Sequence, residues 1–331
     1  MTAYKTLKGQ SIRQVAQDPT NPLVGEIWYN TTIGVLKGRR FVAAAWASGG
    51  NLNTARTITG TGTQTAGLGF GGNAPPPSNN PVALTEEYNG STWSEQNDLN
   101  TARLGMGGAG TQTAGLAFAG RLAAPPTTYK NETEEYNGSS WSEQNNINTA
   151  RINLGGCGTQ TAALAFGGDA SGVTAVTETY NGTSWSEVND MNTAREVISG
   201  AGTQTAAVGF GGYTGGKTGA TEEWDGSSWT NSNSMGSARY ALGGSGTQTA
   251  ALAFGGSEAP SPTTSGATEE YNGTSWTTTG SMGTGRRQHG SANSSVSTAS
   301  LAFGGNDGSP TNATEEFTGD VTATVTITSS T

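Results

Sequence analysis

The chain has 331 residues, including 52 Gly, with 32% hydrophobic residues and a formal net charge of -9 at pH 7. Its single cysteine, Cys157, excludes an internal disulfide, and its single histidine, His289, excludes a metal site built from several histidines. No apolar run approaches the length of a membrane span, and the first thirty residues lack the apolar core of a signal peptide. We therefore expect a protein that is made in a cytoplasm and is not inserted in a membrane.

Residues 1–40 form a basic segment, with six Lys and Arg against two Asp and Glu, whereas the rest of the chain has 10 against 23. The acidic body argues against nucleic-acid binding, which requires a basic face. The basic segment is either an arm that contacts an acidic partner or a solvated terminus. Candidate attachment residues are Lys5, Lys8 and Arg13, with Trp28 as a candidate contact to another subunit.

A unit of 44–49 residues follows and occurs six times. Each unit contains a Phe-Gly-Gly triplet or a near variant, which begins at Phe70, Phe118, Phe166, Phe210, Phe254 and Phe303. An aromatic residue then follows acidic residues, at Tyr88, Tyr136, Tyr180, Trp224, Tyr271 and Phe317. Five residues later comes a Trp in the first five units, and ten residues after each Trp comes an Arg. A repeat of this length indicates an array of similar structural units.

The last unit lacks its Trp, and the N-terminal segment FVAAAWASGGNLNTAR contains the missing element. There Phe41 precedes Trp46 by five residues, and Trp46 precedes Arg56 by ten. An open array has no use for such a split unit, whereas a closed ring does, because closure removes exposed sheet edges.

Each unit is predicted to form four short strands. Before each Phe-Gly-Gly, large and tiny residues alternate, as in Ala66-Leu68-Phe70 with Gly67 and Gly69 between them. Such alternation is typical of a strand packed between two close sheets. Gly-Thr-Gln-Thr and Asn-Gly supply turns, and no helical periodicity of useful length is present. The first strand follows the Arg, the second ends in Phe-Gly-Gly, the third ends at the Tyr, and the fourth carries the Trp.

These units resemble the Kelch family of β-propellers, whose blade has a double glycine after the second strand and a spaced Tyr and Trp in the outer strands. Phe118-Ala119-Gly120 departs from the double glycine, and Trp224 and Phe317 replace the Tyr. The resemblance implies an all-β, six-bladed propeller over residues 41–320, closed by the N-terminal strand. An extended arm (1–40) would precede it. Residues 321–331 would form a C-terminal strand or tail, and Val321–Ile327 is either an edge strand or a strand lent to a neighbour.

A second resemblance concerns residues 21–46, NPLVGEIWYNTTIGVLKGRRFVAAAW, which look like short modules near the N-termini of phage virion and tail-fibre-type proteins. The near-identical repeats rich in Gly, Thr, Asn and Ser also look like those in tailed phages of marine bacteria. This resemblance implies a location in the virion and an N-terminal segment that contacts other virion proteins.

The repeated arginines are Arg56, Arg103, Arg151, Arg195, Arg239 and Arg286. A ring of guanidinium groups at a propeller axis would grip an anionic ligand. The alternative, which recurrence in every unit favours, is that each Arg pairs with a repeated acid such as Glu86, Glu87, Glu134, Glu135, Glu222 or Glu223.

The segments after Phe-Gly-Gly differ between units and are where specificity is expected. The candidate binding residues in them are Arg121, Tyr129, Lys130, Tyr213 and Lys217. The alternative is neutral variation in surface loops.

The sequence gives little support to an enzymatic function. Gly90-Ser91-Thr92-Trp93 fits the end of a sialidase Asp-box, but Tyr88 stands at the Asp position. Kelch-type copper radical oxidases need a Cys-Tyr pair and two His ligands, which a chain with one Cys and one His lacks. We predict no catalytic residue, metal or cofactor.

The expected function is that of a non-enzymatic virion component for host-surface adhesion, through a glycan or protein, or for particle decoration, with a homo-oligomer possible. The alternatives are a bacterial glycan- or protein-binding propeller unrelated to a virion, and a hydrolase with an unrecognised site.

Overall fold

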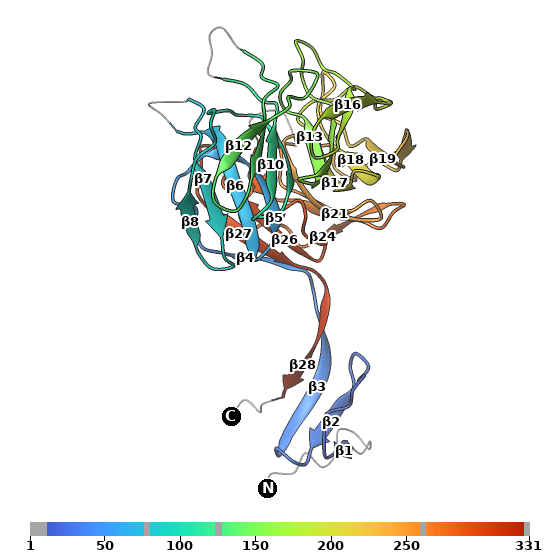
Figure 1. The fold of residues 1–331 in the computed structure, drawn as a ribbon. Coiled ribbons are helices and arrows are strands. Elements are labelled where there is room, and N and C mark those ends of the chain that lie inside the picture. Colours follow the sequence, from blue (N-terminus) through green and yellow to red (C-terminus); the bar gives the residue numbers. More distant parts are fainter. Residues whose placement is uncertain (1–11, 76–79, 123–127, 259–262, 328–331) are drawn as a thin grey trace. The chain divides into compact units, whose positions relative to one another are not determined.

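The computed structural model describes residues 12–75, 80–122, 128–258 and 263–327, and this part of the chain contains strands and turns but no helix. The prediction of an all-β protein is therefore confirmed (Figure 1). The chain forms two compact units, one of Met1–Ala44 with Gly319–Thr331 (unit 1) and one of Ala45–Thr318 (unit 2). In the described residues the structure has no helix of the length and apolarity needed to cross a membrane.

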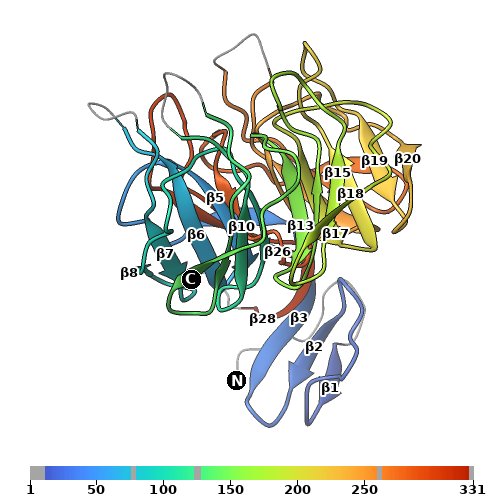
Figure 2. The same ribbon diagram turned by 45° about the horizontal axis from the view of Figure 1, so that its top comes forward.

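Unit 2 contains, among its described residues, six four-stranded antiparallel sheets, numbered here in chain order (Figure 2). Sheet 1 consists of β5 (Thr57–Thr63), β6 (Ala66–Asn73), β7 (Thr85–Tyr88) and β8 (Trp93–Gln96). Sheet 2 consists of β9 (Gly107–Gly110), β10 (Gly115–Phe118), β11 (Thr133–Tyr136) and β12 (Trp141–Gln144). Sheet 3 consists of β13 (Gly155–Thr159), β14 (Ala162–Phe166), β15 (Thr177–Tyr180) and β16 (Trp185–Val188).

The remaining three sheets repeat the same order. Sheet 4 consists of β17 (Ser199–Thr203), β18 (Ala206–Phe210), β19 (Thr221–Trp224) and β20 (Trp229–Ser232). Sheet 5 consists of β21 (Gly243–Thr247), β22 (Ala250–Phe254), β23 (Thr268–Tyr271) and β24 (Trp276–Thr279). Sheet 6 consists of β25 (Gly290–Ser291), β26 (Ala299–Phe303), β27 (Thr314–Thr318) and β4 (Ala45–Ser48). These four-stranded sheets fit a propeller-like fold.

Sheet 6 combines both halves of the chain, as the missing Trp predicts. β4 pairs antiparallel with β27, and Trp46 lies opposite Phe317. Its ring packs 5.0 Å from that of Phe254 and 5.2 Å from that of Phe317. Trp46 therefore occupies in sheet 6 the position that Trp141 occupies opposite Tyr136 in sheet 2.

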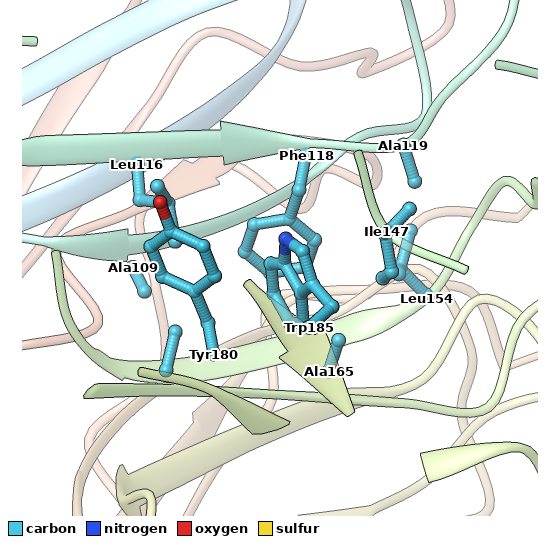
Figure 3. Close-up of a cluster of buried hydrophobic side chains, with 10 residues drawn as sticks. Ala109, Leu116, Phe118, Ala119, Ile147, Leu154, Ala165, Tyr180 and Trp185 are labelled. Atoms are coloured by element: carbon cyan, nitrogen blue, oxygen red, sulfur yellow. The ribbon is translucent and has the colours of Figure 1, made fainter. Parts of the chain in front are cut away.

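The repeated aromatic residues fill the space between neighbouring sheets. Phe118 of sheet 2 and Trp185 of sheet 3 are buried with their ring centroids 4.9 Å apart, and Tyr180 packs beside them (Figure 3). The indole Nε1 of Trp185 donates a 3.0 Å hydrogen bond to Oγ1 of Thr133 in sheet 2. Each buried aromatic ring thus removes a large apolar area from water while its polar atom keeps a partner.

The same indole-to-threonine bond links every sheet to the one before it. The pairs are Trp93 to Thr314, Trp141 to Thr85, Trp185 to Thr133, Trp229 to Thr177, Trp276 to Thr221 and Trp46 to Thr268. The first strands of successive sheets also contact one another, from β5 through β9, β13, β17 and β21 to β25, and β25 contacts β5.

Glycine is required where these first strands approach one another. A Cβ atom added to Gly156 would lie 2.7 Å from Cζ of Phe118 and 2.9 Å from the carbonyl oxygen of Gly108. Any side chain there would push the neighbouring sheet away, which explains much of the high glycine content.

Unit 1 is a four-stranded sheet in the order β1 (Arg13–Val15), β2 (Ile27–Asn30), β3 (Val35–Val42) and β28 (Val321–Thr326). β1 runs parallel to β2, and the other pairs are antiparallel. The expectation of an extended arm over residues 1–40 is wrong for residues 12–40, because β3 forms backbone pairs on both sides. β28 pairs with β3 of its own chain, as the edge-strand alternative for Val321–Ile327 expects.

Trp28 requires a second correction. It is fully buried, and its Nε1 donates a 3.0 Å hydrogen bond to Asp18, so it is not free to contact another subunit. Asp18 also pairs with Lys37 at 2.5 Å, and these bonds lower the pKa of its carboxyl to about 2. Arg13 is exposed and pairs with Glu26 at 3.1 Å. Lys5 and Lys8 lie outside the described residues.

Candidate functional site

One end of the unit 2 sheets carries the segments that differ most between repeats. Because successive strands are antiparallel, the connection from the second strand to the third and the connection to the next sheet emerge at the same end. There, single bridges extend the ladder beyond the strands. The bridged residues are Leu104, Arg121 and Tyr129; Ile152, Asp169 and Val173; Glu196, Tyr213 and Lys217; Tyr240, Ser257 and Thr264; Arg287, Asn306 and Pro310; and Asn73 with Pro81. We call these residues the collar.

In the collar the backbone hydrogen bonds recur from sheet to sheet, whereas the side chains differ. In sheet 4, for example, Glu196 N–H donates to the carbonyl of Tyr213 at 3.0 Å, and Tyr213 N–H donates back to Glu196 at 2.8 Å. Sheet 3 has the same reciprocal pair between Ile152 and Asp169, at 3.0 and 2.8 Å. Backbone bonds thus hold the position of each collar residue whatever its side chain, which is the arrangement a binding surface needs.

The six repeated arginines lie beneath the collar and are fully buried. Each forms an ion pair with the first Glu of the third strand: Arg56 with Glu86, Arg103 with Glu134, Arg151 with Glu178, Arg195 with Glu222, Arg239 with Glu269 and Arg286 with Glu315. The structure therefore places these side chains as the pairing alternative expects. A buried, paired guanidinium is not available to grip an anionic ligand at the axis.

Five of these arginines, all but Arg151, also donate hydrogen bonds to backbone carbonyls that flank a variable segment. Arg195 donates through Nη1 to the carbonyls of Gly211 and Ala220, at 3.1 and 2.5 Å, and these two residues flank the segment that carries Tyr213 and Lys217. Burial lowers the pKa of the Arg195 guanidinium, and the adjacent Glu222 opposes that lowering. The arginine is thus a support for the collar.

The second Glu of the third strand makes a different link. Glu87 accepts a 2.9 Å hydrogen bond from the Tyr136 hydroxyl of sheet 2, and Glu135 accepts a 3.0 Å bond from the Tyr180 hydroxyl of sheet 3. Burial and this carboxylate raise the pKa of Tyr136. The paired Glu residues therefore have separate roles, one within a sheet and one between sheets.

The candidate binding residues all lie at the collar, although from two sheets that are not adjacent in chain order. Tyr129 donates a 2.9 Å hydrogen bond to Asp169 of the next sheet, and Lys130 pairs with Glu132 at 2.7 Å. Tyr213 packs edge-on against Tyr240 of sheet 5, with ring centroids 5.8 Å apart. Lys217 is exposed.

Positive charge in unit 2 is confined to this end. Of its ten Lys and Arg residues, six are the buried arginines, and the other four are Arg121, Lys130, Lys217 and Arg287. Three of these are collar residues and Lys130 follows Tyr129 directly. The Nε atoms of Arg121 and Arg287 are buried without a hydrogen-bond partner. Arg287 is not among the binding residues predicted from the sequence, although it stands at the variable position after a repeated arginine, which is a signal that the sequence carries.

A series of five backbone hydrogen bonds connects residues that line a cavity. The bonds are Asn153 N–H to Gly105 O (2.8 Å), Val197 to Asn153 (2.7 Å), Ala241 to Val197 (3.0 Å), Gln288 to Ala241 (2.9 Å) and Ile58 to Gln288 (3.2 Å). Four non-glycine residues of this series, Asn153, Val197, Ala241 and Gln288, have φ between 50° and 58°. Such strained backbone persists only where surrounding bonds hold it.

The cavity has a volume of about 130 Å³ and is lined in part by buried side chains of Met106, Leu154, Ile198 and Leu242, with His289 as the one titratable side chain among its lining residues. The His289 ring stacks on Phe254 at 5.4 Å. Burial, and to a lesser degree the charge of Arg286, lowers its pKa to about 4. Its Nδ1 contacts the Gly290 carbonyl and its Nε2 has no partner among the described residues. The ring is therefore uncharged at neutral pH.

Within the described ranges, no group of three or more His, Cys, Asp or Glu side chains is placed to hold a metal ion. No protein-family model matches the chain, and no curated protein matches its sequence.

Proposed function

We propose that unit 2 is a six-bladed, Kelch-type β-propeller closed by β4, and that it acts as a non-enzymatic binding module. The cyclic order of contacts between first strands supports this proposal, because β25 returns to β5. The indole-to-threonine bonds run in the same order, and those of Trp46 and Trp93 complete the cycle. A ring of separate four-stranded sheets leaves only short sheet edges, which suits a domain exposed outside a cell.

In this proposal the collar binds an anionic glycan on a host surface. The observation that carries it is the gathering of all four solvent-directed Lys and Arg residues of unit 2 at one end of an otherwise acidic unit with 22 Asp and Glu. The collar also contains Asp169 and Glu196, but away from the collar and Lys130 the surface of unit 2 has no Lys or Arg to offset its acids, so an anionic ligand meets the least repulsion at the collar. The half-buried Tyr213 and Tyr240 add rigid aromatic faces on which a sugar ring can pack.

The proposed setting is a phage particle, in which the N-terminal segment joins other virion proteins and the propeller serves adhesion or decoration. The likeness of residues 21–46 to modules of virion proteins supports it. The alternative is a bacterial glycan- or protein-binding propeller unrelated to a virion. Mass spectrometry of purified particles separates the two, since the virion proposal requires peptides of this chain at stoichiometric amounts.

The collar proposal is tested by a glycan array probed with the full chain and with the triple variant Arg121→Ala, Lys217→Ala, Arg287→Ala. We expect the parent to bind acidic glycans, with affinity falling as salt rises, and the variant to lose that binding. The matched control is Thr65→Ala with Thr113→Ala, two exposed residues at the opposite end of the sheets. Binding that survives the triple substitution, or that is lost equally in the control, would reject the collar as the site.

A further inference from the structure

Unit 1 holds most of the exposed apolar side chains of the described chain. Eight large hydrophobic residues are strongly exposed, and six of them belong to unit 1: Leu23, Val24, Ile27, Ile33, Phe41 and Val321. Unit 2, although much larger, contributes only Val173 and Val296. Of these six, Val321 lies on β28, the strand at one edge of the unit 1 sheet.

One edge of the unit 1 sheet is a strand with open hydrogen-bonding groups. Among the described residues β28 pairs with β3 alone. Ile327 N–H donates to the Leu36 carbonyl at 2.8 Å, so the odd-numbered residues of this strand direct their backbone groups to β3. Thr322, Thr324 and Thr326 therefore direct theirs outward. β28 has no charge and no proline, the features with which edge strands usually prevent pairing.

The side chains of β28 are sorted by face. Val325 lies opposite Gly38 in the ladder, and a Cβ atom added to Gly38 would lie 3.2 Å from Cδ1 of Ile327 and 3.6 Å from Cγ1 of Ile27. Val321, Ala323, Val325 and Ile327 thus share an apolar face with Ile27, whereas the threonines share the other face.

The sequence of this strand is symmetric about Thr324. Ala323 matches Val325, Thr322 matches Thr326, and Val321 matches Ile327. If two copies pair antiparallel with Thr324 opposite Thr324, every apolar residue meets an apolar residue and every threonine meets a threonine. The outward backbone groups of the even-numbered residues then face each other as hydrogen-bonded pairs.

Unit 1 has six Lys and Arg against three Asp and Glu, far from the excess of acid in unit 2. The charge nearest the axis is that of Arg39 on β3, which lies opposite Thr324 and donates hydrogen bonds to the hydroxyls of Thr324 (3.4 Å) and Thr322. In the pair the two Arg39 guanidinium groups would therefore approach each other on the threonine face. Both are partly exposed to solvent, so water and salt screen this repulsion.

We propose that β28 is a self-association edge, at which two copies of this chain pair antiparallel about a two-fold axis at Thr324 to form one continuous sheet. The occupant is a second copy because the strand is complementary to itself. An interface built on one strand pair is small, so we expect a dimer that dissociates at concentrations of tens of micromolar.

The test is sedimentation velocity of the full chain up to about 100 µM. We expect the parent and the control Thr324→Val, which keeps the backbone and the β-branched shape, to dimerise. Because Arg39 lies opposite Thr324 and bonds to it, the charged variants are made together with Arg39→Ala and compared with Arg39→Ala alone. In that background Thr324→Lys and Thr324→Asp each set like charges opposite one another at the axis and should raise Kd at least about tenfold. An equimolar mixture of the two variants sets Lys opposite Asp and should restore a dimer.

Three results would overturn the proposal: a parent that stays monomeric at the highest concentration, a dimer that neither charged variant weakens, or a mixture that fails to assemble. Near-ultraviolet circular dichroism of each variant checks that the tryptophan environment is unchanged, so that loss of the dimer is not loss of folding. The outcome is independent of the collar, whose glycan binding is measured separately.

Discussion

Removal of one buried arginine tests the most repeated interaction of unit 2. In Arg195→Met the Glu222 carboxylate stays buried without its 2.9 Å ion pair, and the carbonyls of Gly211 and Ala220 lose their donor. Breaking a buried ion pair from one side costs about 3–5 kcal/mol. At about 2–4 °C per kcal/mol for a unit of this size, Tm should fall by roughly 6–20 °C.

The matched control is Lys130→Met, which removes the half-exposed pair with Glu132 and should cost less than about 1 kcal/mol. The double variant Arg195→Met with Glu222→Met should regain much of the lost stability, because no charge is then left buried alone. Thermal unfolding followed by circular dichroism gives Tm for the parent, these three variants and Glu222→Met alone. The ion-pair reasoning is refuted if Arg195→Met has the same Tm as Lys130→Met. It is also refuted if the double variant loses as much stability as Arg195→Met and Glu222→Met added together.

Three further predictions concern other parts of the fold. Trp46→Ala should lower the free energy of unfolding by about 3–5 kcal/mol, as much as Trp141→Ala, because both rings pack between sheets. Urea unfolding measures both values. A much smaller loss for Trp46→Ala would mean that β4 does not stabilise sheet 6. The pKa of His289 is depressed from 6.5 to about 4, so its contribution to the free energy of unfolding is complete above pH 6.5 and is lost as the pH falls toward 4. The NMR signal of this single imidazole should not titrate near pH 6.5, and His289→Leu should remove the pH dependence. The pKa of Tyr88 is raised from 10.0 to about 12 by burial and by Glu316, so its contribution to the free energy of unfolding is complete below pH 10 and is lost as the pH rises toward 12. Absorbance at 295 nm should show tyrosine ionisation well above pH 10, and Tyr88→Phe should reduce that part of the signal. Ionisation of Tyr88 near pH 10 would contradict the prediction.

Most of what the sequence predicts about the sheets comes from the repeated unit. Spacing between Phe-Gly-Gly, Tyr, Trp and Arg predicted four strands per unit, and the absent Trp of the last unit predicted that Trp46 would pair near Phe317. These inferences succeeded because a period-two pattern and turn residues are local properties of the chain. The candidate residues of the variable segments likewise followed from position in the repeat, and they lie at the collar.

Other features depended on contacts that no local pattern records. Trp28 was judged by its place outside the repeat, but Asp18 and its neighbours bury it. The basic segment was read as an arm because its partner strand β28 is nearly three hundred residues away. Arg287 was overlooked because it adjoins Arg286, and only the fold separates a buried arginine from one at the collar.

The sequence by itself determined the strands, their turns and the copying of one sheet, since these follow from residue size, alternation and spacing. The tertiary structure decided which charges are neutralised in the interior and which remain at the surface. It paired each repeated arginine with the first glutamate of a third strand and gave the second glutamate to a neighbouring sheet where a tyrosine is present. Two adjacent glutamates look alike in the chain, but a strand directs consecutive side chains to opposite faces, and the surroundings of each face set its role.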